Sequence, residues 1–130
     1  MERILSILLA LLITAVVDCH PWKPNHYVII DTDGGIDDIR AITMFLASPD
    51  VRILGITTSG GALSPGNSYI KVKSLLNSMF HAGIPVGSDT GGSYGMKEMP
   101  FALQARWGSE DGISPKEAPD NLDIISSLLK

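Results

Sequence analysis

The sequence predicts an α/β domain built on a parallel, Rossmann-like layered sheet. Two observations predict this class. Short runs rich in β-branched residues alternate with segments whose apolar residues recur at helical spacing, and the resulting order is strand, helix, strand, helix, strand. The chain has 130 residues, of which 45% are hydrophobic and 18% charged, so it fits one globular domain at most. The formal charge of −4 and the lack of a basic patch with interleaved aromatic residues argue against nucleic acid as a partner.

Residues 1–19 are predicted to form a signal peptide. Arg3 precedes an apolar run from Ile4 to Val17, which is too short to cross a bilayer as a helix. Asp18 stands where a lipoprotein signal has a small residue, which argues against anchoring through Cys19. The mature chain, residues 20–130, is therefore expected to be secreted or periplasmic, to contain no cysteine, and to meet a membrane only through its leader. An uncleaved membrane anchor is the alternative.

Five elements are expected before the loop-rich segment that begins at Gly87. They are a strand over His26–Asp31, a helix over Ile36–Ala47, a strand over Val51–Thr58, a helix over Asn67–His81 and a short strand that starts at Ile84–Val86. The first strand is apolar on both faces, which is typical of a buried parallel strand. Lys71 and Lys73 are expected on the solvated face of the second helix.

The second half of the sequence has a weaker pattern. From Gly87 to Pro119, glycines, prolines and scattered charges predict one long loop, and Asp120–Lys130 predicts a capped helix. Three strands make a small sheet for this class, so the architecture is expected to be incomplete. Open sheet edges predict association, either as a homo-oligomer or with a complementing C-terminal portion.

Four aspartates follow the first strand within eight residues, in the stretch "DTDGGIDD": Asp31, Asp33, Asp37 and Asp38. The carboxyl ends of parallel strands are where ligands bind in such sheets. The amino end of the next helix stabilises a carboxylate by only about 0.3–1 kcal/mol, which is small beside the mutual repulsion of four. A hard divalent cation, best Ca²⁺, is therefore the expected counter-ion. The alternative is that Asp37 caps the helix, Asp38 complements its dipole and the other two are solvated.

The stretch "VIIDTDGGIDDIRAI" resembles the amino-terminal signature of the inosine/uridine-preferring nucleoside hydrolase family. That signature is an apolar strand, Asp-x-Asp-Pro-Gly-x-Asp-Asp and a helix. Further stretches keep the family order: "LASPDVRILGITTSGG" resembles the second strand and its Thr-Thr turn, "GIPVGSD" the third strand, and "WGSEDGI" a His-Gly-x-x-Gly-Leu segment. The match runs from about Tyr27 to the last residue, so residues 20–130 are expected to be the N-terminal portion of such a domain.

The resemblance implies hydrolysis of the N-glycosidic bond of a small-molecule ribonucleoside, with Ca²⁺ as cofactor. Asp33 takes the place of the general base, which also binds the cation and removes a proton from the cation-bound water. Asp38 takes the place of a bidentate calcium ligand, and Asp37 that of the residue that grips the ribose hydroxyls. Asp31 is expected to support the metal site. Thr58 ends the second strand at the edge of the same site.

Several residues depart from the family pattern. Gly34 replaces a proline and is expected to loosen the turn, Ala62 stands where a ribose-binding asparagine follows a glycine, and Trp107 replaces a histidine. Asn67 is not expected to substitute for the missing asparagine. These departures keep a second hypothesis open: a non-catalytic relative of the same fold that binds a ribosyl or carbohydrate ligand. A haloacid-dehalogenase-type phosphatase, which also uses a strand-end Asp-x-Asp, ranks last because it would have Thr or Val where Gly34 stands.

Overall fold

The computed structural model describes residues 23–90, 95 and 97–130. The predicted signal peptide, residues 1–19, lies outside the described residues. The elements are β1 (His26–Thr32), α2 (Ile36–Ala47), β2 (Val51–Thr58), α3 (Pro65–Ser78), β3 (Val86–Ser88), α4 (Pro100–Gln104), a 3-10 helix (Pro115–Glu117) and α5 (Asn121–Leu128). Within the described ranges, no helix is long and apolar enough to cross a membrane.

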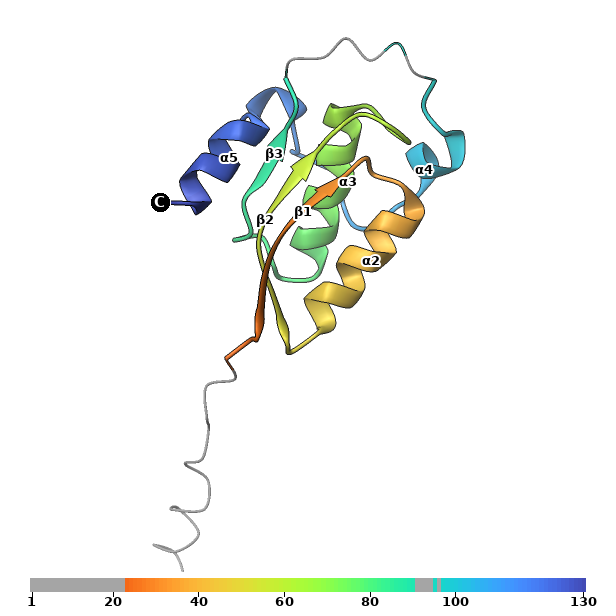
Figure 1. Ribbon diagram of the computed structural model, residues 1–130. Coiled ribbons are helices and arrows are strands. Elements are labelled where there is room, and N and C mark those ends of the chain that lie inside the picture. Colours follow the sequence, from red (N-terminus) through yellow and green to blue (C-terminus); the bar gives the residue numbers. More distant parts are fainter. Residues whose placement is uncertain (1–22, 91–94, 96) are drawn as a thin grey trace, which may run out of the picture.

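The strands form a three-stranded parallel sheet in the order β1-β2-β3, which confirms the predicted α/β class. Helices α2 and α3 cover one face of the sheet and α5 covers the other, next to β2 and β3 (Figure 1). Because all three strands run in the same direction, their carboxyl ends share one edge. The turn from β1 into α2, which carries the aspartates, lies at that edge.

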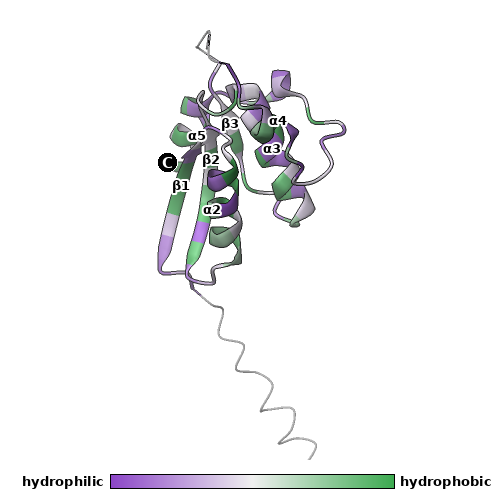
Figure 2. Cartoon of the chain, turned by 90° about the vertical axis from the view of Figure 1, so that its right-hand side faces the viewer, coloured by the Kyte–Doolittle hydropathy of each residue, from purple (hydrophilic) through white to green (hydrophobic). Residues whose placement is uncertain are grey.

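β1 is less buried than its sequence predicts. It is an edge strand, and its central residues Val28, Ile29 and Ile30 are only partly buried, because α5 packs on β2 and β3. Figure 2 shows the run of hydrophobic residues along β1 and β2 and the mixture of hydrophobic and hydrophilic residues along α2. The apolar run therefore predicts the strand correctly but overestimates how deeply β1 is buried.

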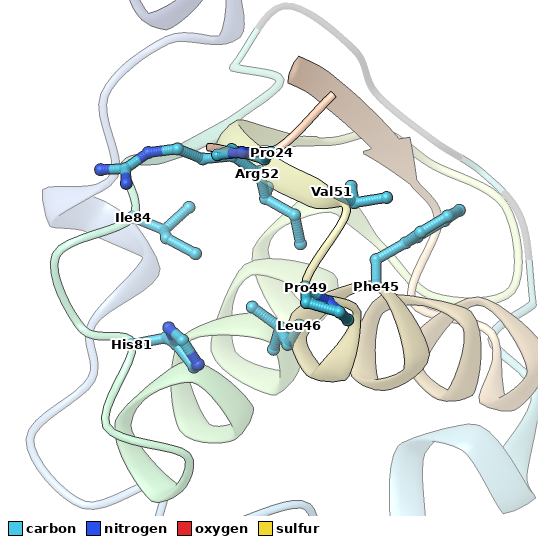
Figure 3. A pocket seen from close by; sticks show the side chains of 9 residues that line it. Pro24, Phe45, Leu46, Pro49, Val51, Arg52, His81 and Ile84 are labelled. Atoms are coloured by element: carbon cyan, nitrogen blue, oxygen red, sulfur yellow. The ribbon is translucent and has the colours of Figure 1, made fainter. Parts of the chain in front are cut away.

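The amino ends of the strands border an apolar groove at the far end of the sheet from the aspartates. Phe45 and Leu46 at the end of α2, Ile84 before β3 and the imidazole of His81 contribute to its lining (Figure 3). The lining also contains Arg52, and none of its described residues has a carboxylate. This groove therefore lacks the acidic chemistry that the sequence predicts for the functional site.

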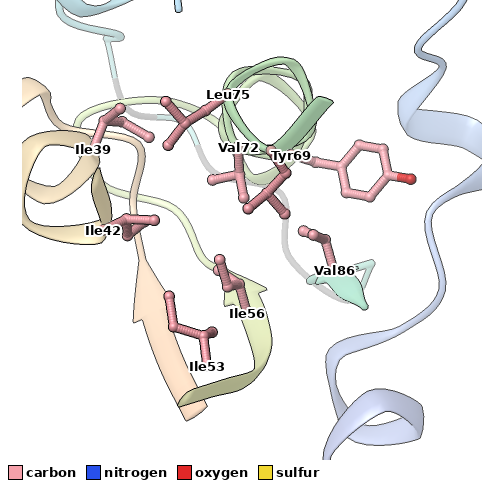
Figure 4. Packing of buried hydrophobic residues seen from close by; sticks show 9 residues of the cluster. Ile39, Ile42, Ile53, Ile56, Tyr69, Val72, Leu75 and Val86 are labelled. Carbon is pink, nitrogen blue, oxygen red and sulfur yellow. The ribbon is translucent and has the colours of Figure 1, made fainter. Parts of the chain in front are cut away.

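The hydrophobic core lies between the sheet and helices α2 and α3 (Figure 4). Ile53 and Ile56 both point into it, although residues three apart in a regular strand point to opposite faces. The pairing of β1 with β2 shifts between Val28 and Ile29, and the extra residue in β2 rotates the strand so that both isoleucines face the helices. The remaining core residues are Ile39, Ile42, Tyr69, Val72, Leu75, Leu76 and Val86.

The helix boundaries differ from the predicted ones mainly in the second half. α3 begins at Pro65, two residues earlier than expected, because Ser64 caps it and accepts a hydrogen bond from the Asn67 amide at 3.4 Å. The predicted long loop from Gly87 to Pro119 contains α4 and the 3-10 helix, so that expectation was wrong. Both helices begin with a proline, a residue that favours the first helical position, and this signal was available in the sequence.

Lys71 is buried, contrary to the expectation of a solvated face. Its side chain is 3% exposed, and its ammonium group donates to Glu110 Oε1 at 2.7 Å and to the Ala105 carbonyl at 2.8 Å. Arg106 pairs with the other oxygen of Glu110. The segment after α4 is therefore attached to α3 through one buried cation, which compensates for the weak apolar pattern of this segment.

Replacing Glu110 by glutamine is expected to lower the free energy of unfolding by about 1–2 kcal/mol at neutral pH, since the Lys71 ammonium loses its counter-charge. Burial raises the pKa of the Glu110 carboxyl, but Lys71 and Arg106 outweigh it and hold the pKa below the ordinary 4.5. A lowered carboxyl pKa stabilises the fold above the unfolded-state pKa, and this stabilisation is lost as the pH falls through the folded-state pKa. Denaturant titrations should therefore show a difference between wild type and variant that shrinks below pH 4.5. Glu117→Gln is the matched control, and an equal loss in both variants would contradict this role.

Candidate functional site

A pocket of about 600 Å³ lies at the carboxyl edge of the sheet, beside the start of α2. Three of the four predicted aspartates line it: Asp33 from the turn after β1, and Asp37 and Asp38 from the first turn of α2. Arg40 is the single cation among the described lining residues. The other lining residues are Gly35, Ile36, Ala62, Met99 and Phe101. Acidic and apolar side chains thus share one small-molecule-sized pocket.

Asp33 is fixed by backbone N–H groups on both of its carboxylate oxygens. Oδ1 accepts from the Gly35 amide at 3.0 Å, and Oδ2 accepts from the Ala62 amide at 2.9 Å. The Asp33 carbonyl accepts from Ser68 Oγ at 2.7 Å and from the Leu63 amide at 3.0 Å. Each carboxylate oxygen still has a lone pair, so Asp33 can accept further bonds from a ligand without changing its orientation.

Asp38 is held through the hydroxyl of Thr32, the last residue of β1. Thr32 Oγ1 donates to Asp38 Oδ2 at 2.8 Å and accepts from the Gly34 amide at 3.1 Å, and Thr32 is 2% exposed. The Asp33 amide lies 3.3 Å from the same Asp38 oxygen. Strand, turn and helix are therefore connected by one set of bonds, and Asp38 Oδ1 is left for a ligand.

The turn at Gly34 has a backbone conformation and a hydrogen bond that a proline could not provide. Gly34 has φ +78°, a conformation that proline cannot adopt, and its amide donates to Thr32 Oγ1. A Cβ at this position would lie 2.6 Å from Ser68 Oγ. The expected loosening of the turn stays a prediction, but glycine allows a hydrogen bond here that proline would remove.

Asp37 and Asp31 have different surroundings. Asp37 is exposed and lines the pocket. Asp31 does not line it, because successive residues of a strand point to opposite faces and Thr32 points toward α2. Both Asp31 oxygens accept from hydroxyls at the end of the neighbouring strand β2, from Thr57 at 2.7 Å and from Ser59, the residue after the strand, at 3.0 Å. Asp31 thus joins the carboxyl ends of β1 and β2 beneath the turn that carries Asp33.

The carboxylate oxygens in the pocket are ligands of the kind that a hard cation binds. Asp33, Asp37 and Asp38 offer carboxylate oxygens in one pocket, which are the ligands that Ca²⁺ prefers. Among the described residues, however, no group of three or more His, Cys, Asp or Glu side chains is close enough to hold a metal ion. These residues therefore provide part of a coordination sphere of six to eight oxygens rather than all of it.

Three other residues named from the sequence have structural positions. Thr58 Oγ1 lies 3.0 Å from the carbonyl oxygens of both Pro65 and Gly87. Trp107 packs against the core, and Asn67 Nδ2 donates to Glu98 Oε1 at 2.7 Å. Neither Trp107 nor Asn67 lines the pocket. Asn67 therefore does not take the place of the asparagine that Ala62 replaces.

Met99 and Phe101 line the pocket but were not predicted from the sequence, because they fall in the stretch that was expected to be a structureless loop. The start of α4 at Pro100 was the available signal for an ordered segment. That signal gives the helix but not the side of the molecule on which it lies. The position of α4 follows from long-range hydrogen bonds, which no local pattern in the sequence reveals.

Comparison with known proteins identifies the family. The model for inosine-uridine preferring nucleoside hydrolases matches residues 28–124. The chain is 31% identical over 111 residues to the pyrimidine-specific ribonucleoside hydrolase RihA of Salmonella arizonae, covering 79% of this chain and 34% of the relative. It is 27% identical over 112 residues to RihA of Klebsiella pneumoniae, covering 79% and 35%.

A solved structure supports the same assignment. An inosine-guanosine nucleoside hydrolase superimposes with a TM-score of 0.54 at 25% identity, over 82% of this chain and 35% of that chain. The chain thus spans about a third of the length of the relatives that it matches. The matched region contains the strand, the aspartate turn and the helix described above. The chain belongs to the inosine-uridine preferring nucleoside hydrolase family.

Proposed function

We propose that this chain carries the cation- and ribose-binding carboxylates of a nucleoside hydrolase, which cleaves the N-glycosidic bond of a ribonucleoside to give base and ribose. The observation that carries the proposal is the pocket at the carboxyl edge of the sheet, where Asp33, Asp37 and Asp38 lie together. Membership of the family supports it. The relatives, of which this chain covers about a third, are named as ribonucleoside hydrolases.

Asp33 and Asp38 would hold Ca²⁺, and the ribose hydroxyls and water would complete its oxygen shell. When bound, the cation supplies Lewis acidity that favours deprotonation of the attacking water. Asp31 contributes indirectly, since its bonds to Thr57 and Ser59 hold the strand ends beneath the turn. The Thr32 hydroxyl fixes one oxygen of Asp38 and leaves the other directed to the ligand.

Asp33 acts as the general base in this proposal. The amides of Gly35 and Ala62 fix its carboxylate, so its free lone pairs have a defined direction. Asp33 accepts the proton of the water that adds to the anomeric carbon, while the nucleobase leaves with the electrons of the C–N bond. Asp37 is exposed at the pocket and accepts hydrogen bonds from the ribose hydroxyls, which orients the sugar relative to Asp33.

A second function, ligand binding without turnover, is favoured by one observation. At Ala62 the backbone amide donates to Asp33, but the methyl side chain cannot form a hydrogen bond with ribose. The loss of one positioning hydrogen bond lowers transition-state stabilisation more readily than it removes binding. A relative that retains the cation and the sugar but has lost catalysis would have such a site.

Removal of Ca²⁺ distinguishes these functions. Calorimetric titration of the full chain with Ca²⁺ is expected to show binding, and release of hypoxanthine from inosine or uracil from uridine is expected to stop when a chelator is added and to return with Ca²⁺. Binding of Ca²⁺ and ribose with no base release would favour the non-catalytic relative. The absence of both binding and base release would contradict the proposed site.

A further inference from the structure

We propose that Met99 and Phe101 form an apolar wall that receives the nucleobase, with the ring of Phe101 stacking on it. This inference rests on the proposed function, because it assigns the part of the substrate that the carboxylates do not bind. The two side chains are called the apolar wall below.

The apolar wall lines the same pocket as Asp33, Asp37 and Asp38. Met99 is 46% exposed and Phe101 is 60% exposed, although both are large hydrophobic side chains. A ligand that carries both hydroxyl groups and a flat, weakly polar ring has partners for both kinds of lining residue. A ribonucleoside carries both, since its sugar can reach the carboxylates while its base covers the apolar wall. Aromatic stacking accepts any base because every base has a π-face.

The segment that carries the apolar wall is fixed to the protein by its other residues. Ala102 is 1% exposed and directs α4 inward, between the two more exposed residues Phe101 and Leu103. Glu98 Oε1 accepts from the Ser64 amide at 2.8 Å and from Asn67 Nδ2 at 2.7 Å. These hydrogen bonds hold the pKa of the Glu98 carboxyl below its ordinary value, so Glu98 is ionised in these contacts at neutral pH. The exposure of Phe101 is therefore a feature of an anchored helix.

One residue connects the apolar wall with the carboxylates. The Ala62 amide donates to Asp33 Oδ2 at 2.9 Å, and the Ala62 carbonyl accepts from the Met99 amide at 2.8 Å. The position of the apolar wall relative to Asp33 is thus fixed through the backbone of a single residue, Ala62. Figure 1 shows α4 beside the turn that leads from β1 into α2, as this connection requires.

The test compares a sugar with a nucleoside that cannot be hydrolysed. Ribose and pseudouridine, whose base is joined to ribose through a carbon–carbon bond, are titrated into the Ca²⁺-saturated full chain. Wild type is expected to bind pseudouridine about tenfold more tightly than ribose, from the stacking of one base. Phe101→Ala should abolish this tenfold advantage and leave the affinities for ribose and Ca²⁺ unchanged. Leu103→Ala is the matched control, because Leu103 is 40% exposed on the same helix but does not line the pocket.

The outcomes separate the two proposals. If wild type binds ribose and pseudouridine equally well, or if Phe101→Ala leaves the difference intact, the apolar wall does not bind the nucleobase. The proposed sugar and cation site is not contradicted by that result. If wild type binds neither Ca²⁺ nor ribose, the proposed function fails and this inference fails with it. Phe101→Leu keeps an apolar side chain and guards against misfolding; it should retain ribose binding and lose most of the advantage of pseudouridine.

Discussion

Replacing Asp33 by asparagine is expected to lower base release by about 10² to 10⁴-fold, the usual contribution of a general base, and to weaken Ca²⁺ binding as well. Both effects arise because the amide cannot accept a proton and carries no charge. One backbone amide that now faces a carboxylate oxygen, from Gly35 or Ala62, would face an NH₂ group instead. That change is expected to lower the free energy of unfolding by only about 1 kcal/mol. Base release, calcium calorimetry and a denaturant titration of the same preparation separate these effects.

Two further aspartates make the controls for this result. Asp123→Asn changes an exposed residue in the first turn of α5, on the other face of the sheet, and should leave base release and Ca²⁺ affinity unchanged. Asp37→Asn should weaken ribose binding while Ca²⁺ affinity falls much less, since Asp37 is proposed to bind the sugar. If Asp33→Asn binds Ca²⁺ with wild-type affinity, Asp33 is not a ligand of the cation. If the variant releases the nucleobase at the wild-type rate, Asp33 is not the general base.

The fold was predictable where local patterns and tertiary packing agree. The bounds expected for α2 and β2 are those observed, because α2 has apolar residues at helical spacing and β2 is rich in β-branched residues. The segment from Gly87 to Pro119 was not predictable in the same way. It is attached by the buried ion pair of Lys71 with Glu110 and by the hydrogen bonds of Glu98, and such polar contacts between distant residues leave no periodic signal.

The residue types of the candidate site were predictable, but the direction in which each side chain points was less so. The spacing of the aspartates and the expected strand end placed Asp33, Asp37 and Asp38 near one edge, and all three line one pocket. The same spacing does not show that Asp31 bonds to Thr57 and Ser59 instead of lining the pocket. It also does not show the apolar wall, because α4 reaches the pocket from residues more than sixty positions further along the chain.

Gly61→Ala is expected to disable the site without altering any carboxylate. A Cβ at this position would lie 2.1 Å from Asp33 Oδ2 and 2.7 Å from Asp33 Cγ, well inside contact distance. The Asp33 side chain must therefore move, and it loses the hydrogen bond from the Ala62 amide. We expect Ca²⁺ binding to be lost together with base release, and the free energy of unfolding to fall by about 1–3 kcal/mol, the usual cost of an inserted group that forces its neighbours to shift.

Gly83→Ala is the matched control, because a Cβ there meets nothing within 4 Å. It should retain wild-type Ca²⁺ binding and stability, so a loss confined to Gly61→Ala would be due to the contact with Asp33 and not to the general effect of replacing glycine. Intact calcium binding in Gly61→Ala would mean that the observed orientation of Asp33 is not the one that binds the cation. The pair of variants thus tests whether the turn after β2, through a glycine that leaves room for one carboxylate, sets the geometry of the proposed base.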